Sequence, residues 1–274
     1  MPEAPQDIWA VIRQEVEEEA TREPLLSGFL HETILKHDNL VDALGFHLSH
    51  KLSNSILSPG MLQEIMEEAF KNLPIMECVV SMDIRAIHDR DPACRHYYEP
   101  LLFYKGFHSL ESYRVAHWLW TQNRKSLAYF LQNRISEVFA VDIHPAARIG
   151  TGVFIDHATS IVIGETAVVE DNVSILHDVT LGGTGKDVGD RHPKVRHGVL
   201  IGAGAKILGN VEIGEGAKIG AGSVVLNNIP PHCTAVGVPA VIAGKAEVAE
   251  PALAMDHSLS EVPPCTKSNQ CPRS

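Results

Sequence analysis

The stretch VLIGAGAKILGNVEIGEGAKIGAGSVV, residues 199–225, decides the fold, because an aliphatic side chain returns at every sixth position. The same frame runs back along the chain with two breaks, a two-residue slip after Ile155 and an eight-residue insertion after Leu181. All thirteen first positions are then Ile, Leu or Val: Ile143, Ile149, Ile155, Ile163, Val169, Ile175, Leu181, Val195, Ile201, Ile207, Ile213, Ile219 and Val225. Such residues fill roughly a quarter of an average chain, so the frame is not an accident of composition.

The other hexad positions indicate how the chain turns. The fifth position is small or β-branched, as in Thr159, Val173 and Ala205, so first and fifth positions are expected to line a narrow interior. The fourth position is Gly, Asn or Asp in nine hexads, as in Asn172 and Gly204, and these residues tolerate the positive φ of a tight corner. Three hexads that close one triangular coil predict a parallel β-helix whose coils stack about 4.8 Å apart. The pattern alone does not set its hand.

The chain before the repeat has helical spacing. Leu62, Met66 and Phe70 recur behind the breaker Ser58-Pro59-Gly60, which predicts an amphipathic helix. A second long helix is expected from about Leu110 to Phe139, and the stretch 89–92 is expected to be a loop between helices.

Composition limits the functional classes. The formal charge of −11 and a pI of about 5.7 give no global field that would attract nucleic acid or an anionic membrane. The N-terminus carries no apolar run and no stretch reaches the length of a membrane span, so we expect a cytoplasmic protein without a membrane anchor. Five cysteines without a Cys-x-x-Cys pair fit reduced thiols better than a zinc site or a disulfide framework.

Short segments carry the functional signal. In the repeat these are VDIHP (141–145), DHAT (156–159), GETA (164–167), LGGTGK (181–186) and GDRHPK (189–194), and the helical half adds DRDPA (89–93) and LLFYKGFH (101–108). Together they resemble the serine O-acetyltransferase family over nearly everything up to about residue 245. The resemblance implies an α+β chain, with an all-α N-terminal domain over 1–140, a left-handed parallel β-helix of hexapeptide repeats over 141–245, and a flexible C-terminal tail over 246–274.

The chemistry of this family needs a base. A serine hydroxyl is a poor nucleophile at neutral pH, and histidine has a suitable pKa to accept its proton, so His157 is the candidate general base. The resemblance assigns Asp142 to orient His157. It also assigns the substrate carboxylate to Arg191 and His192, and the substrate ammonium to two carboxylates, Asp91 and Asp156.

The remaining expectations also rest on the resemblance. Acetyl-CoA is expected as co-substrate along the β-helix, near Gly183, Ala203 and Ala221, with no permanently bound cofactor or metal. L-Serine is the expected acceptor and L-cysteine the expected inhibitor. The family pattern predicts a homotrimer of β-helices that doubles through the helical domains to a hexamer. Relatives that bind O-acetylserine sulfhydrylase end in isoleucine, so that partner is doubtful for a chain ending in Ser274.

Three other functions remain open from sequence. A γ-type carbonic anhydrase uses the same hexad and three histidines on zinc, for which His157, His192 and His197 are the candidates. Against it, His192 falls in the insertion outside the repeat register, and Arg191 beside it would disfavour a cation. A related acyltransferase for sugars or other amines is a second alternative. A β-helix that serves only as an assembly scaffold is the third, and it would leave Asp142, Asp156 and His157 without a role.

Overall fold

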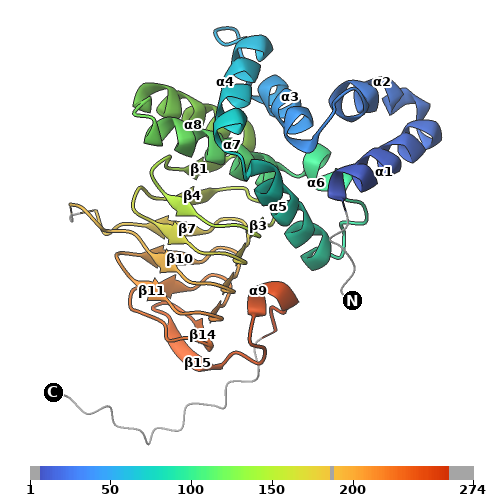
Figure 1. The fold of residues 1–274 in the computed structure, drawn as a ribbon. Coiled ribbons are helices and arrows are strands. Elements are labelled where there is room, and N and C mark those ends of the chain that lie inside the picture. The colour runs from blue at the N-terminus through green and yellow to red at the C-terminus, as the bar shows by residue number, and fades with distance from the viewer. Residues whose placement is uncertain (1–6, 186–187, 259–274) are drawn as a thin grey trace, which may run out of the picture.

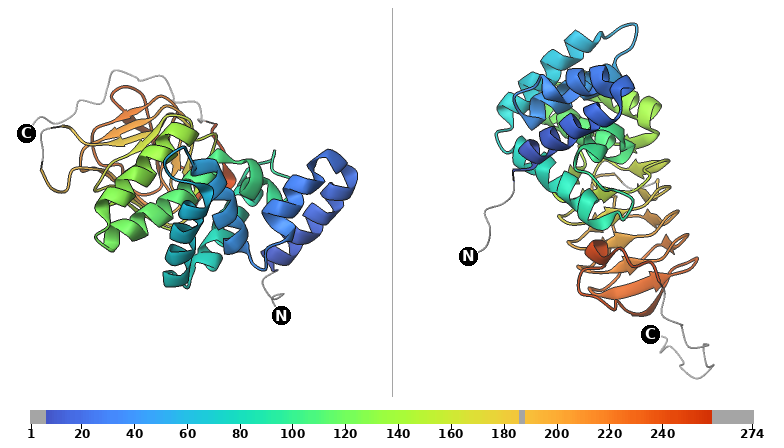
Figure 2. Two further views of the ribbon diagram at one scale, coloured as in Figure 1. Left: turned by 90° about the horizontal axis from the view of Figure 1, so that it is seen from above. Right: turned by 90° about the vertical axis from the view of Figure 1, so that its right-hand side faces the viewer.

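A computed structural model describes residues 7–185 and 188–258 of the chain. It has two parts stacked end to end (Figures 1 and 2): helices that finish at Phe139, and coils of short strands that begin at Val141. Among the described residues, no helix is long and apolar enough to cross a membrane.

The helical part contains eight α-helices and two short helical turns. In order these are α1 (Ile8–Arg22), η1 (Pro24–Leu26), α2 (Ser27–Leu30), η2 (His31–Leu35), α3 (Leu40–Leu52), α4 (Pro59–Asn72), α5 (Met76–Arg90), α6 (Tyr98–Phe103), α7 (Lys105–Thr121) and α8 (Lys125–Phe139). Side-chain caps fix several starts: Asp7 accepts from the amides of Trp9 and Ala10, and Ser58 accepts from the amide of Met61 with Pro59 in the first turn. The helix predicted behind Ser58 is therefore confirmed as α4.

The single long helix predicted from Leu110 to Phe139 is wrong, because the chain turns back on itself in the middle. Asn123 takes a left-handed conformation with φ 60°, and the Arg124 amide donates to the Leu119 carbonyl at 2.9 Å. Asparagine tolerates this conformation better than most residues, so α7 and α8 form a hairpin. The loop predicted at 89–92 starts later than expected, because α5 continues through Arg90.

The second part is a parallel β-helix with three flat faces. Sheet A contains β1 (Val141–Ile143), β4 (Ile161–Ile163), β7 (Thr180–Gly182), β10 (Lys206–Leu208) and β13 (Val224–Val225). Sheet B contains β2 (Arg148–Ile149), β5 (Val168–Val169), β8 (Lys194–Val195) and β11 (Glu212–Ile213). Sheet C contains β3 (Phe154–Ile155), β6 (Ser174–Ile175), β9 (Leu200–Ile201), β12 (Lys218–Ile219), β14 (Cys233–Val236) and the antiparallel β15 (Val241–Lys245).

Each coil visits the three sheets in the order A, B, C, which defines three corners. The CA corner joins sheet C to sheet A and contains residues 156–160 in the first coil, followed by 176–179, 202–205 and 220–223. The AB corner contains residues 144–147, 164–167, the insertion up to 193, and 209–211. The CA and AB corners are therefore the two long edges of sheet A.

The hexad prediction of the interior holds at nearly every position. Ile149 is only half-buried, and all other first positions are buried. The fifth position fails at Thr159, which is exposed, while its neighbour Ala158 is fully buried. The two-residue slip lies at this corner, so it moves Ala158 into the interior and turns Thr159 outward.

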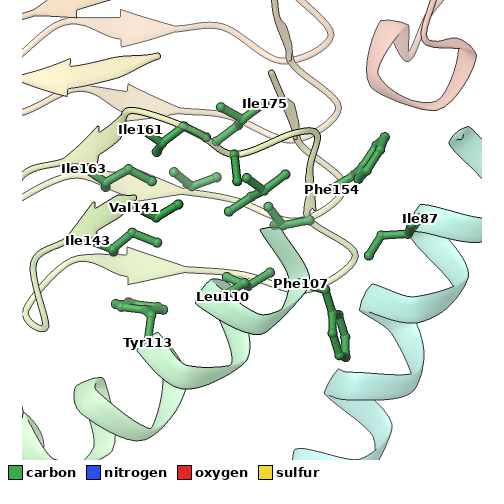
Figure 3. Close-up of a cluster of buried hydrophobic side chains, with 14 of the residues drawn as sticks. Ile87, Phe107, Leu110, Tyr113, Val141, Ile143, Phe154, Ile161, Ile163 and Ile175 are labelled. Atoms are coloured by element: carbon green, nitrogen blue, oxygen red, sulfur yellow. The ribbon is translucent and has the colours of Figure 1, made fainter. Parts of the chain in front are cut away.

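Helix α7 closes the open end of the β-helix. Leu110 and Tyr113 project from α7 toward the first coils, as Figure 3 shows, and both are buried, as is Phe107. The Tyr113 hydroxyl donates to the carbonyl of Ala147. An open β-helix end exposes unsatisfied strands and apolar side chains, so this packing both caps the repeat and fixes the helices relative to it.

The last described residues fold back onto the β-helix. The short helix α9 (Pro251–Ala254) lies beside sheet C (Figure 1), and Ala252 is fully buried. Its amide donates to the Gly198 carbonyl at 3.2 Å, and its carbonyl accepts from the Ser174 hydroxyl at 2.9 Å. The expectation of a flexible tail over 246–274 stays a prediction, and α9 is the helix that the structure describes within it. Residues 259–274, with Ser274, lie outside the described part of the chain.

Candidate active site

The CA corner of the first coil has an unusual backbone. His157, Ala158 and Ser160 take positive φ values of 55°, 60° and 66°. In the coils below, the same corner uses Asp178 and Gly204, residues suited to that conformation. A side chain such as histidine in this region costs about 1 to 3 kcal/mol, and such strain persists only where surrounding contacts impose it.

A pocket of about 520 Å³ opens beside this corner. Its walls come from the α5–α6 loop, the start of α7 and the end of β3: Asp91, Ala93, Phe103, Tyr104, Lys105, Gly106, Ile155, Asp156 and His157. The His157 side chain is 77% exposed, and its Nε2 lies 3.8 Å from Oδ1 of Asp156. The candidate base therefore stands at the mouth of the pocket, free to meet a second molecule.

Two carboxylates line the same pocket. Asp91 follows the last residue of α5, and its Oδ1 accepts from the Ala93 amide at 2.8 Å. Burial raises the pKa of Asp156; His157 opposes this shift, and the negative charge of Asp91 adds to it. A cation placed between the two carboxylates would relieve their mutual repulsion, so the pocket suits an ammonium group.

The pocket wall on the helical side lies directly on the β-helix. A Cβ on Gly106 would come within 2.0 Å of the Ile155 carbonyl oxygen, so only glycine allows α7 to begin here. The neighbouring Lys105 donates through Nζ to the hydroxyl of Thr159. The segment 101–108 contributes to the family resemblance, but neither Lys105 nor Gly106 was predicted to have a role. A glycine within a helical pattern often has a packing reason, and this was the signal that could have found Gly106.

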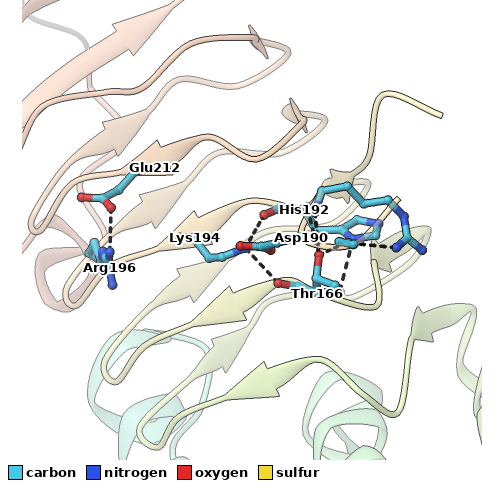
Figure 4. Close-up of polar contacts among 8 residues, drawn as sticks. Thr166, Asp190, His192, Lys194, Arg196 and Glu212 are labelled. Carbon is cyan, nitrogen blue, oxygen red and sulfur yellow. Dashed lines mark hydrogen bonds and ion pairs between the residues drawn. The ribbon is translucent and has the colours of Figure 1, made fainter. Parts of the chain in front are cut away.

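The AB corner carries the second group of predicted residues, and Figure 4 shows part of it. His192 is only 7% exposed, and its Nδ1 accepts from the Thr166 amide at 3.2 Å, which leaves the ring proton on Nε2. Burial, and then the charge of Arg191, lowers the pKa of His192, so the ring is neutral near pH 7. A Cβ on Gly164 would come within 2.0 Å of this ring, so glycine is needed beneath it.

Arg191 is held in place by its neighbours. Its Nη2 pairs with Oε2 of Glu165 at 2.7 Å, and its amide donates to the Thr166 hydroxyl at 3.0 Å. The same hydroxyl accepts from the His192 amide at 3.1 Å. Thr166 therefore fixes both Arg191 and His192 through one oxygen. Gly183 lies next to them, since a Cβ there would stand 3.5 Å from Nε2 of His192.

Asp142 lies on sheet A and does not contact His157 within the described chain. Its Oδ1 accepts from Nε2 of Gln132 at 2.6 Å, and its charge acts on His144 at the AB corner. The carboxylate nearest to His157 Nε2 in the same chain is Asp156. One chain therefore does not provide the Asp142–His157 pair that the resemblance implied.

Of the three positions expected to contact CoA, Ala203 and Ala221 lie at the CA corner and Gly183 lies at the AB corner. The Gly204 amide donates to the His177 carbonyl at 3.0 Å, and the Gly222 amide donates to the Ala203 carbonyl at 2.8 Å. These bonds stack Ala203 and Ala221 one coil apart at the CA corner, two and three coils below His157. Gly183 belongs to the AB corner, with Arg191 and His192.

The arrangement also bears on the zinc alternative. His157 lies at the CA corner, His192 at the AB corner, and His197 at the third corner, where its Nε2 is 3.1 Å from Glu250. Within one chain the three rings point from three edges of a prism and cannot share an ion. Over residues 7–185 and 188–258, no three metal-ligating side chains gather closely enough to hold one.

Comparison with known proteins agrees with the fold. The hexapeptide model of bacterial transferases (six repeats) matches residues 192–227, so the β-helix is of the hexapeptide-repeat transferase class. The model described as "Serine acetyltransferase, N-terminal" matches residues 8–112.

Relatives cover nearly the whole chain. Serine acetyltransferase of Escherichia coli K12 is 55% identical over 255 residues, which is 93% of each chain. A solved serine acetyltransferase in complex with cysteine is 57% identical with a TM-score of 0.91, and it covers 93% of this chain and 99% of its own. The serine acetyltransferase of Brucella abortus S19 in complex with coenzyme A is 52% identical with a TM-score of 0.86, and it covers 87% and 95%. The chain belongs to the serine acetyltransferase family.

Proposed function

We propose that this protein transfers the acetyl group of acetyl-CoA to the hydroxyl of L-serine, giving O-acetyl-L-serine and CoA. The observation that carries the proposal is the pocket in which an exposed histidine, His157, stands beside two carboxylates, Asp91 and Asp156. A base and an ammonium site in one pocket fit an amino acid with a side-chain hydroxyl. The solved relatives with cysteine and with coenzyme A support both halves of the reaction.

The reaction needs no covalent enzyme intermediate. The ammonium of serine lies between Asp91 and Asp156, and its hydroxyl points to His157. His157 takes the hydroxyl proton while the oxygen attacks the thioester carbonyl, and a C–O bond forms. The tetrahedral intermediate then breaks its C–S bond, and the imidazolium returns the proton to the departing CoA thiolate.

We propose that the site is completed by a second copy of the chain. The pocket holds a base and an ammonium site, whereas Arg191 and His192 lie across sheet A at its other edge, and Asp142 lies on β1 of sheet A. A ring of three parallel β-helices would bring the CA corner of each copy against the AB corner of the next, and it would close. In that ring Arg191 and His192 of the neighbour meet the substrate carboxylate, and Asp142 of the neighbour orients His157.

A hexamer of two such rings is the family pattern, and the helical domain offers a surface for it. Leu25, Leu26 and Phe29, at η1 and α2, are 93%, 40% and 39% exposed. Apolar side chains at such exposure are a common mark of an assembly surface.

Acetyl-CoA is the proposed co-substrate, with no permanently bound cofactor. Ala203 and Ala221 continue the His157 corner downward, so the pantetheine arm can follow this edge with its thioester beside His157. Gly183 of the neighbouring copy would form the opposite side of that channel.

L-Cysteine is the proposed inhibitor, since it offers the same carboxylate and ammonium as serine with a thiol in place of the hydroxyl. It would occupy the serine site. A cytoplasmic location and weak or absent binding to O-acetylserine sulfhydrylase remain predictions.

The direct test is the release of thiol from acetyl-CoA by the purified protein, with and without L-serine, and with an acceptor panel of amino sugars and other amines. We expect release that depends on L-serine. Release driven better by an amino sugar would replace the proposal with the related acyltransferase. The absence of both acetyl-CoA binding and thiol release would favour the scaffold function.

A further inference from the structure

The His157 corner needs an external restraint. Three of its residues, His157, Ala158 and Ser160, take positive φ, although each carries a side chain. The only part of the corner directed into the β-helix core is Ala158, which is fully buried. A conformation of this kind is kept by contacts from outside the corner.

The start of α7 supplies such a contact. Thr159, which the hexad frame predicted to face the interior, is turned outward, and its hydroxyl accepts a hydrogen bond from Nζ of Lys105. The Thr159 amide in turn donates to the His157 carbonyl at 2.7 Å. Lys105 is therefore linked through one residue to the backbone of the candidate base.

The backbone that carries Lys105 is itself fixed. Gly106 lies so close to β3 that a Cβ would come within 2.0 Å of the Ile155 carbonyl oxygen. The Ser109 hydroxyl donates to the Gly106 carbonyl at 2.8 Å, which ties the first turn of α7 together. The Lys105 end of the link to Thr159 thus stands on a rigid element.

Lys105 lines the pocket without pairing with its two carboxylates. Asp91 and Asp156 line the same pocket, but in the described part of the chain Lys105 forms no ion pair with either. Its ammonium is engaged with Thr159. The two carboxylates stay available for the ammonium of a substrate.

We propose that Lys105 is a positioning residue, which holds the left-handed corner through Thr159 so that His157 faces the substrate hydroxyl. This inference rests on the proposed acetyl transfer. Lys105 itself touches neither the serine nor the thioester. Its loss should therefore slow the chemical step more than it weakens binding.

Two substitutions test the link from its two ends. Lys105→Met keeps the length of the side chain and removes the donor, and Thr159→Val keeps the shape and removes the acceptor. Each should lower kcat by about tenfold to a hundredfold, because small errors in the placement of a base are costly, and should change KM for serine and acetyl-CoA by less than about threefold. The double variant should be no slower than the slower single variant, since both changes break one hydrogen bond.

A conservative variant and a control separate positioning from folding. Lys105→Arg should recover most of the activity that Lys105→Met loses, and Lys71→Met, at an exposed lysine of α4, should match the wild type. A rise in serine KM with unchanged kcat would overturn the proposal and make Lys105 a substrate-binding residue. Fully additive losses in the double variant would overturn it as well. Wild-type protein without serine-dependent thiol release would instead refute the proposed function.

Discussion

The two edges of sheet A hold the candidate residues in opposite ways. At the CA corner, His157 is 77% exposed on a strained backbone, and its nearest carboxylate is 3.8 Å away. At the AB corner, His192 is only 7% exposed, and its ring nitrogen and its amide are both bonded to Thr166. The CA corner exposes a base to a second molecule. The AB corner holds its side chains in a fixed arrangement that can bind one.

Both edges arise from a break in the same repeat. The two-residue slip after Ile155 creates the His157 corner, and the eight-residue insertion after Leu181 creates the loop with Arg191 and His192. Elsewhere the hexads run in register and serve to build the prism. Departures from a regular pattern are thus where the functional groups lie, as expected when most of a sequence specifies structure consistently.

The largest difference between the edges should appear on removal of the base. His157→Ala should lower kcat by about 10² to 10⁴-fold while acetyl-CoA still binds, because the hydroxyl loses its proton acceptor. His31→Ala is the control, since His31 is exposed in η2 and does not line the pocket. Steady-state kinetics and CoA binding measure both. Near-normal turnover of His157→Ala would refute the mechanism.

Substitutions at the AB corner should weaken the binding of serine. Arg191→Ala should raise KM for serine by about 10- to 100-fold, in line with the loss of charged hydrogen bonds, and weaken cysteine inhibition by the same factor. Arg196→Ala is the control, because Arg196 follows β8 of sheet B and pairs with Glu170 and Glu212. Inhibition assays at several serine concentrations decide the matter. Unchanged potency of cysteine in Arg191→Ala would place its site elsewhere.

The buried His47 should make the stability of the helical part depend on pH. Burial lowers the pKa of His47 to about 4, and its Nε2 lies 3.2 Å from the carbonyl of Leu102 in α6, next to the pocket wall. In the unfolded chain His47 binds a proton near pH 6.5, whereas in the folded chain it stays neutral down to about pH 4. The folded state therefore has its full stability above pH 6.5 and loses stability as the pH falls toward 4. At pH 5 the loss is about 2 kcal/mol from His47 alone.

Urea unfolding at pH 7 and pH 5 measures this loss. His47→Gln keeps a donor for Leu102 without the titration, so its stability should fall less between the two pH values than that of the wild type. His31→Gln, at an exposed histidine, should leave the wild-type difference unchanged. An equal pH dependence in His47→Gln and the wild type would assign the effect to other groups.

Removing one hydrogen-bond acceptor from the AB corner should have a smaller effect on kinetics. Thr166→Val removes the hydroxyl that accepts from the amides of Arg191 and His192, and should raise KM for serine by about five- to tenfold with kcat nearly unchanged. Thr159→Val, at the other edge, should instead lower kcat. The two threonine variants therefore test whether the AB corner acts on binding and the CA corner on the chemical step. A lowered kcat in both variants would contradict this difference between the corners.

The sequence predicts most of the β-helix, because one rule of spacing is repeated thirteen times and each coil contacts only its neighbours. It fails at Thr159, because a frame counted in sixes does not say which side of a slip turns inward. It also fails at the α7–α8 turn, where one left-handed residue, Asn123, interrupts an apolar pattern that continues on both sides.

The site was harder to predict than the fold. The residue types at His157, Asp156 and Arg191 indicate acetyl transfer, but motif reading treats them as one site and cannot show that sheet A separates them. Lys105 and Gly106 carry no titration or metal signature of their own, so only their contacts with Thr159 and Ile155 bring them to notice.

The central claim, that each active site combines the His157 edge of one copy with the Arg191 edge of the next, is tested most directly by mixing two inactive variants. The His157→Ala variant keeps Arg191 and His192 at the AB corner intact. The variant with both Arg191→Ala and His192→Ala keeps the base His157. Co-expressed in equal amounts and assayed at low serine, they should assemble with both edges intact at about one contact in four, and so show about a quarter of wild-type activity. Mixed assemblies no more active than the separate variants would contradict the account, because a site within one chain cannot be restored by its neighbour.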